Sequence, residues 1–105
     1  MVQQEESPGN TNTTAGSRVL LDNSLVRVIE IWIAVEGRTD LHFHPPNVVY
    51  SLCNGKAKFT SKDGKSVEAE IKQGEAVFSD GGWHVVENLG VTEIRAVHFE
   101  LKNTE

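Results

Sequence analysis

Short runs rich in Val, Ile, Phe and Trp alternate with turn signals along most of this 105-residue chain. Asn54-Gly55 and Asp63-Gly64 are dipeptides that favour tight two-residue hairpin loops. Helical periodicity never persists for three turns, so the pattern predicts a nearly all-β domain. Strands this short with turns this regular are typical of a sandwich or a small barrel, and the pattern alone does not choose between them.

The expected strands divide the chain into an arm and one domain. Residues 1–17 are polar and offer almost no apolar side chain for burial, so we expect a disordered or loosely ordered N-terminal arm. A single domain then covers residues 18–105, with its longest strand at 25–35. The later strands are expected at 48–53, 56–61, 66–71, 75–79, 83–88 and 92–101.

Composition excludes several classes of partner. Acidic residues outnumber basic ones by 15 to 10, so no basic stripe is available for nucleic acid. No apolar run approaches the roughly 20 residues of a membrane span, and the N-terminus has no secretory pattern. Cys53 is the single cysteine, in agreement with a reducing compartment. We expect a cytoplasmic protein that binds a small molecule and forms a homodimer through the long strand at 25–35.

His42-Phe43-His44 is the pattern that points to chemistry. On an extended strand, side chains at i and i+2 point to the same side, so both imidazoles can reach one point. His84, on another expected strand, would complete a metal cradle. Neutral imidazoles bind divalent transition metals, and three of them leave coordination positions open. The alternative is that these are unrelated strand histidines.

Two motifs around these histidines resemble those of the cupin superfamily, and the resemblance covers most of residues 18–102. It implies a small antiparallel β-barrel of the cupin or jelly-roll type, with one divalent metal held by the three histidines. The matching residues are Gly37, His42, His44 and Gly55 in the first motif, and Gly74, Gly82, His84 and Asn88 in the second.

Val48 is the main departure from the family pattern. Three residues separate it from His44, and at this spacing the family has a metal-binding glutamate. The chain therefore resembles a three-histidine cupin. A dication held by neutral ligands keeps its full charge and favours an anionic, chelating ligand. The similarity to three-histidine dioxygenases implies an O2-dependent oxygenase that acts on a small chelating anion.

The metal and the reaction stay open. Iron is the expected metal, and the ligand type also admits Zn, Ni, Mn and Cu. A non-catalytic cupin that binds or senses a metal or metabolite would need the same cradle. A metal-dependent lyase or isomerase would too, with Tyr50 as its catalytic base.

Further residues are candidates for the pocket or for a fourth ligand. Val48, Tyr50 and Phe78 are expected to form an apolar wall. Glu30 and His98 each interrupt an apolar strand, and either could add a ligand or simply face away from the site. Asn88 completes the second motif, but it also precedes a turn.

Overall fold

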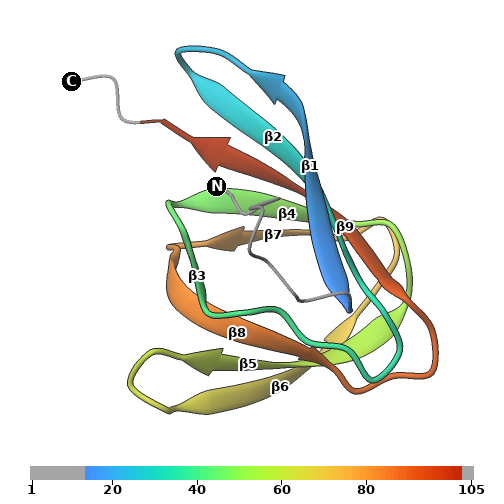
Figure 1. Ribbon diagram of the computed structural model, residues 1–105. Coiled ribbons are helices and arrows are strands. Elements are labelled where there is room, and N and C mark those ends of the chain that lie inside the picture. Colours follow the sequence, from blue (N-terminus) through green and yellow to red (C-terminus); the bar gives the residue numbers. More distant parts are fainter. Residues whose placement is uncertain (1–13, 103–105) are drawn as a thin grey trace.

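The computed structural model describes residues 14–102, which form nine strands and no helix. The strands pack as two antiparallel sheets, one of five strands in the order β1-β2-β9-β4-β7 and one of four in the order β3-β8-β5-β6 (Figure 1). The expected all-β jelly-roll is confirmed. The strands are β1 (Ala15–Asp22), β2 (Val26–Ile33), β3 (His42–His44), β4 (Asn47–Ser51), β5 (Gly55–Ser61), β6 (Ser66–Ile71), β7 (Ala76–Ser79), β8 (Gly82–Asn88) and β9 (Ile94–Leu101).

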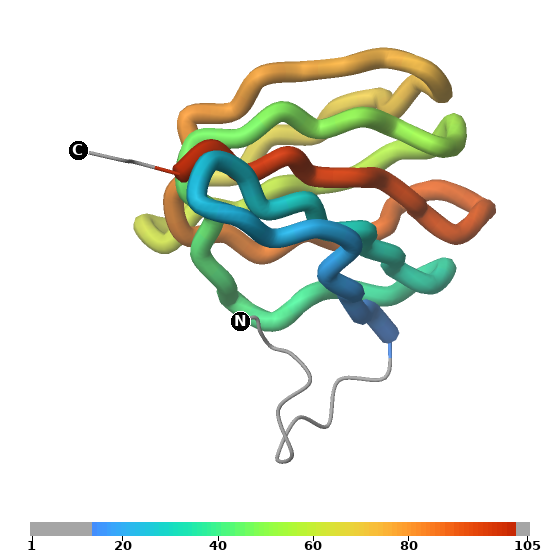
Figure 2. Tube along the Cα trace, turned by 90° about the horizontal axis from the view of Figure 1, so that it is seen from above, coloured from blue at the N-terminus to red at the C-terminus, as the bar shows by residue number. Residues whose placement is uncertain are grey.

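The first strand begins earlier than the sequence indicated. The expected arm lies mostly outside the described residues, but Ala15–Asp22 pairs along the edge of the five-stranded sheet, with Ala15 opposite Ile33. In Figure 2 the blue hairpin of β1 and β2 lies beside the red β9, as the strand order requires. This strand begins three residues before residue 18, where the domain is expected to start.

The fully buried core occupies one end of the sandwich. Ile33 and Ile94 are 1% and 3% exposed and face each other on β2 and β9. They pack with Ala57 and Val86 of the four-stranded sheet. His98 follows Ile94 along β9 by four residues, so it lies about 13 Å further along the strand. The core and the histidines are thus at different levels of the same sandwich.

No helix long and apolar enough to span a membrane is found in residues 14–102.

Candidate metal centre

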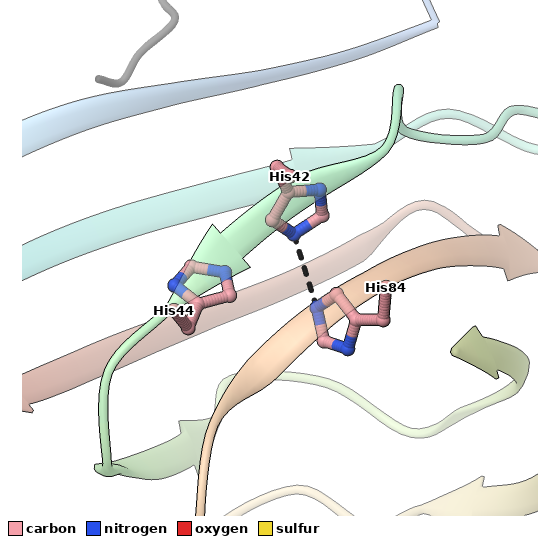
Figure 3. Close-up of side chains that lie close together, drawn as sticks. All are labelled: His42, His44 and His84. Atoms are coloured by element: carbon pink, nitrogen blue, oxygen red, sulfur yellow. Dashed lines mark hydrogen bonds between the residues drawn. The ribbon is translucent and has the colours of Figure 1, made fainter. Parts of the chain in front are cut away.

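Three histidines meet on the inner side of the four-stranded sheet. His42 and His44 lie on β3, and His84 lies directly opposite His42 on β8. One ligand nitrogen from each lies within 4.8 Å of the others, and the Nε2 atoms of His42 and His84 are 3.0 Å apart (Figure 3). The expectation that these three side chains lie together is confirmed.

Hydrogen bonds at Nδ1 orient two of the rings and direct Nε2 toward the cluster. The Nδ1–H of His42 donates to the backbone carbonyl of Asp40 at 2.8 Å. The Nδ1–H of His44 donates to the carboxylate of Glu100 at 2.5 Å. Such bonds fix the tautomer and the ring orientation of histidine ligands. In a neutral ring held in this way, Nε2 is the nitrogen that offers its lone pair to a metal.

The surroundings keep the cluster in its metal-binding form. Burial lowers the pKa of His84 to about 3, helped by the neighbouring imidazoles of His42 and His44. Burial also lowers the pKa of His42, although the carbonyl of Asp40 opposes this shift. Because a metal binds the neutral imidazole, these shifts reduce competition from protons near neutral pH. Three imidazole nitrogens suit a borderline divalent transition metal, so the residues present fit the expected group.

Glu100 is the site residue that sequence reasoning missed. It lies on β9 in the opposite sheet, is only 6% exposed, and reaches across the sandwich to His44. The available signal was its spacing from His98: two residues apart on a strand, the two side chains share a face.

His98 is beside the cluster but is not part of it. Its ring stacks on that of His44 with 4.7 Å between centroids. Burial lowers its pKa well below the usual value, so the ring is neutral. Its Nδ1 has no hydrogen-bond partner within residues 14–102. The structure therefore places His98 next to the candidate ligands, on the wall of the cavity described below.

The expected apolar wall of Val48, Tyr50 and Phe78 is wrong, because these side chains lie on the outer face of the five-stranded sheet. Val48 pairs with Phe78 and Phe99, which are 59% and 38% exposed. Tyr50 does not line the cavity, so it is in no position to act as a base there.

Val49, opposite His98, faces the histidines instead. The alternation of β3 does not continue into β4, because the chain passes from one sheet to the other through Pro45-Pro46. The residue that faces the cavity is separated from His44 by four residues rather than three. Val49, rather than Val48, thus occupies the cavity-facing position at which the expected carboxylate is absent.

Glu30 and Asn88 also lie away from the cluster. Glu30 is on the outer face, where it pairs with Arg18 at 2.9 Å and Arg95 at 3.3 Å, so it supplies no fourth ligand. Asn88 is buried, and its amide donates to the carbonyls of Ile33, Ala34 and Thr92. Its role is to hold loops at the other end of β8.

A cavity of about 1190 Å³ opens from the histidines into the space between the sheets. Its walls are mostly apolar, from residues on the inner faces of both sheets. The apolar residues that line it include Ile29, Ile31, Val49, Phe59, Ile71 and Val77.

Comparison with solved structures finds cupins among the similar folds. A cupin domain from Bordetella pertussis matches over 90% of this chain and 100% of that one, with 29% identity and a TM-score of 0.79. An RmlC-like cupin family protein from Methanocaldococcus jannaschii matches 99% of this chain and 94% of that one, with 12% identity and a TM-score of 0.67. A polyketide cyclase from Streptomyces resistomycificus matches 88% of this chain and 68% of that one, with 21% identity and a TM-score of 0.63. No match is found among protein-family models or curated proteins.

The fold and the similar structures define a class: this chain has the cupin fold. It combines that fold with three histidines gathered beside a cavity.

Proposed function

We propose that this cupin is a metal-dependent oxygenase that acts on a chelating, anionic substrate. The proposal rests on one observation: three imidazoles converge at the wall of a large cavity, and no carboxylate is among the three grouped ligand candidates. Three protein ligands leave coordination positions free for a substrate and O2. Bound iron would supply the redox chemistry.

The chain's own residues perform three tasks in this proposal. His42, His44 and His84 hold the metal, and Asp40 and Glu100 fix the orientation of two of the rings. The apolar wall limits access of water to the bound substrate. The neutral His98 ring, beside His44, provides a hydrogen-bonding group on the same wall.

Elemental analysis of anaerobically purified protein is the first test. We expect about one divalent metal per chain, and we expect His44→Ala to lose most of it. Phe43→Ala is the matched control, because Phe43 lies between the two ligands but is 53% exposed on the other side of β3. Unchanged metal content in His44→Ala would reject the site.

An oxygen electrode then tests the reaction. We expect O2 uptake by iron-loaded protein with one member of a panel of thiols, β-dicarbonyls and carboxylates. Tight binding of a panel member without O2 uptake would reject the oxygenase and favour a binding or sensor protein.

A further inference from the structure

The cavity contains apolar surface that the protein itself does not cover. Ile31, Val49, Phe59 and Ile71 point between the sheets, yet each is only half-buried. Val77, on the same inner surface, is 54% exposed. Exposed apolar surface inside a fold is unfavourable unless a ligand covers it, and ligand pockets are lined in this way.

The apolar part extends away from the histidines. Along β9 the inward side chains run from Glu100 and His98, beside the cluster, to Ala96 and Ile94. At about 3.3 Å per residue, this path is roughly 13 Å long from His98 to Ile94. The buried pair of Ile33 and Ile94 closes that end.

The size of the cavity also argues against a very small substrate. Its volume of about 1190 Å³ exceeds the roughly 300 to 1,000 Å³ typical of pockets for drug-sized ligands. A thiol or carboxylate of a few carbons would leave most of this space to water against apolar walls.

The charges around the cavity predict the orientation of a bound ligand. Exposed Glu75 lines the cavity on the side away from the histidines: its carbonyl accepts from the amide of Ser51, which pairs with Ala96. A negative charge there disfavours an anion at that end. A dication on the histidines would attract an anion to the other end.

We infer that the ligand is a chelating oxygen anion, such as an enolate or hydroxamate, joined to a large apolar body. The anionic head binds at the histidines, and the body lies between the sheets against Ile31 and Phe59. This inference rests on the proposed metal centre and names the substrate class that the centre serves.

A series of hydroxamates of increasing chain length tests the inference on zinc-loaded protein, since zinc supports chelation without redox chemistry. Acetohydroxamate, butyrohydroxamate, hexanohydroxamate and octanohydroxamate are titrated by calorimetry, with metal-free protein in parallel. We expect binding only with zinc, and a gain of about fourfold in affinity for each added CH2 group.

The outcomes separate the two proposals. Equal affinity along the series overturns the apolar-body inference and leaves the metal centre standing. Acetohydroxamate binding that is the same with and without zinc overturns the metal centre, and the proposed function with it.

A variant that fills the cavity shows where the alkyl chain of the hydroxamate binds. We expect Ile31→Trp to bind acetohydroxamate as the native protein does. It should lose most of the increase in affinity that the native protein shows from acetohydroxamate to octanohydroxamate. Thr60→Trp, on the outer face of the four-stranded sheet, is the control and should keep the gain. If Ile31→Trp does not retain zinc, Ile71→Trp at the far end of the cavity provides the same test. A cavity variant that keeps the full increase in affinity for octanohydroxamate would reject the inference.

Discussion

Glu100 is the residue through which the five-stranded sheet reaches the histidine cluster. Its carboxylate is buried, and its bond to His44 joins a negative charge to a ring that is a candidate metal ligand. A carboxylate in this position raises the basicity of the ligand and fixes its tautomer. It also offsets part of the positive charge that a metal would bring.

Replacing this carboxylate tests its role. Glu100→Gln keeps the size of the side chain and a hydrogen-bond acceptor but removes the charge, so we expect zinc affinity to fall by about 10- to 100-fold. Competition with a chromophoric chelator measures the change. Glu75→Gln, at a second carboxylate of the cavity, should leave the affinity unaltered. Equal affinities in the native protein and Glu100→Gln would show that the charge does not act on the metal.

Val49 and Val48 form a matched pair for a second prediction. Val49 lies in the cavity opposite His98, whereas Val48 pairs with Phe99 on the outer face. We expect Val49→Glu to place a carboxylate beside the metal and to slow zinc release to a chelator. The same change at Val48 should have no such effect.

The apo forms complete this comparison. Without metal, the new carboxylate of Val49→Glu is partly buried and unpaired, so its melting temperature should fall below that of the native protein. A lower melting temperature in the presence of zinc, with no slower release, would show that the carboxylate does not reach the metal.

Among the elements, β3 is the most dependent on its neighbours. It has three residues and lies at the edge of its sheet, and within residues 14–102 its one strand partner is β8. The turn before β8 packs against the end of β3: a Cβ on Gly81 would collide with the carbonyl of His44, and the φ of Gly81 is 88°. Glycine is therefore required there for two separate reasons.

Gly81→Ala should accordingly disturb the site as well as the turn. We expect a loss of zinc affinity of at least tenfold, together with a lower melting temperature, because β3 must shift away from β8. Gly64→Ala is the control: its φ is 92°, but a Cβ there meets nothing within 4 Å. It should lower stability through backbone strain alone and leave zinc affinity unchanged. Equal zinc affinities for the two variants would argue against the steric role of Gly81.

The same elements show what the sequence could and could not predict. The alternation of apolar residues and the Gly-containing turns predicted seven of the strands closely, and the His-x-His spacing predicted the cluster. The inward face of β4 was wrong because parity cannot be counted across Pro45-Pro46, where the chain changes sheets. The face on which Glu30 lies stayed open, because its partners, Arg18 and Arg95, come from two other strands. The strand at Ala15–Asp22 lacks a long apolar run and is defined by its pairing with β2.

At the scale of the whole molecule, the outer face of the five-stranded sheet is apolar across three strands. Tyr50, Phe78 and Phe99 are 39%, 59% and 38% exposed there. These three aromatic side chains alone leave roughly 300 Å² uncovered. With Val48 and Leu101 beside them, the patch approaches the size that marks an interface.

We therefore propose a homodimer, which the sequence also predicts, but with this face in place of the strand at 25–35 as the interface. Sedimentation velocity should show a dimer at micromolar concentration. Phe78→Lys should shift the protein to the monomer, whereas Phe43→Lys, on the outer face of the other sheet, should not. A native protein that stays monomeric at every concentration would reject this interface.

The buried histidines make stability depend on pH. Burial lowers the pKa values of His42, His84 and His98 in the folded protein, whereas an unfolded chain titrates near 6.5. Between the lowered and the ordinary values the unfolded state binds more protons, so stability rises with pH across this window. The stabilisation that comes from these histidines should be fully present above about pH 7 and decline as the pH falls.

Thermal melts of the metal-free protein in EDTA, from pH 7.5 to pH 5.5, measure this effect. We expect a steady drop in melting temperature toward low pH, with a shallower slope in His98→Gln, which has one such group fewer. A melting temperature that does not vary over this range would contradict the assignment.

The shortness of β3 also bears on how long the protein survives in a cell. Two of the three candidate ligands sit on this edge strand, so a metal ion bridging them to His84 would clamp the strand to β8. When metal is scarce, residues 39–47 would be the first to open to a protease, since local opening exposes cleavable backbone. Metal supply would then set the abundance of this cupin, as well as its activity.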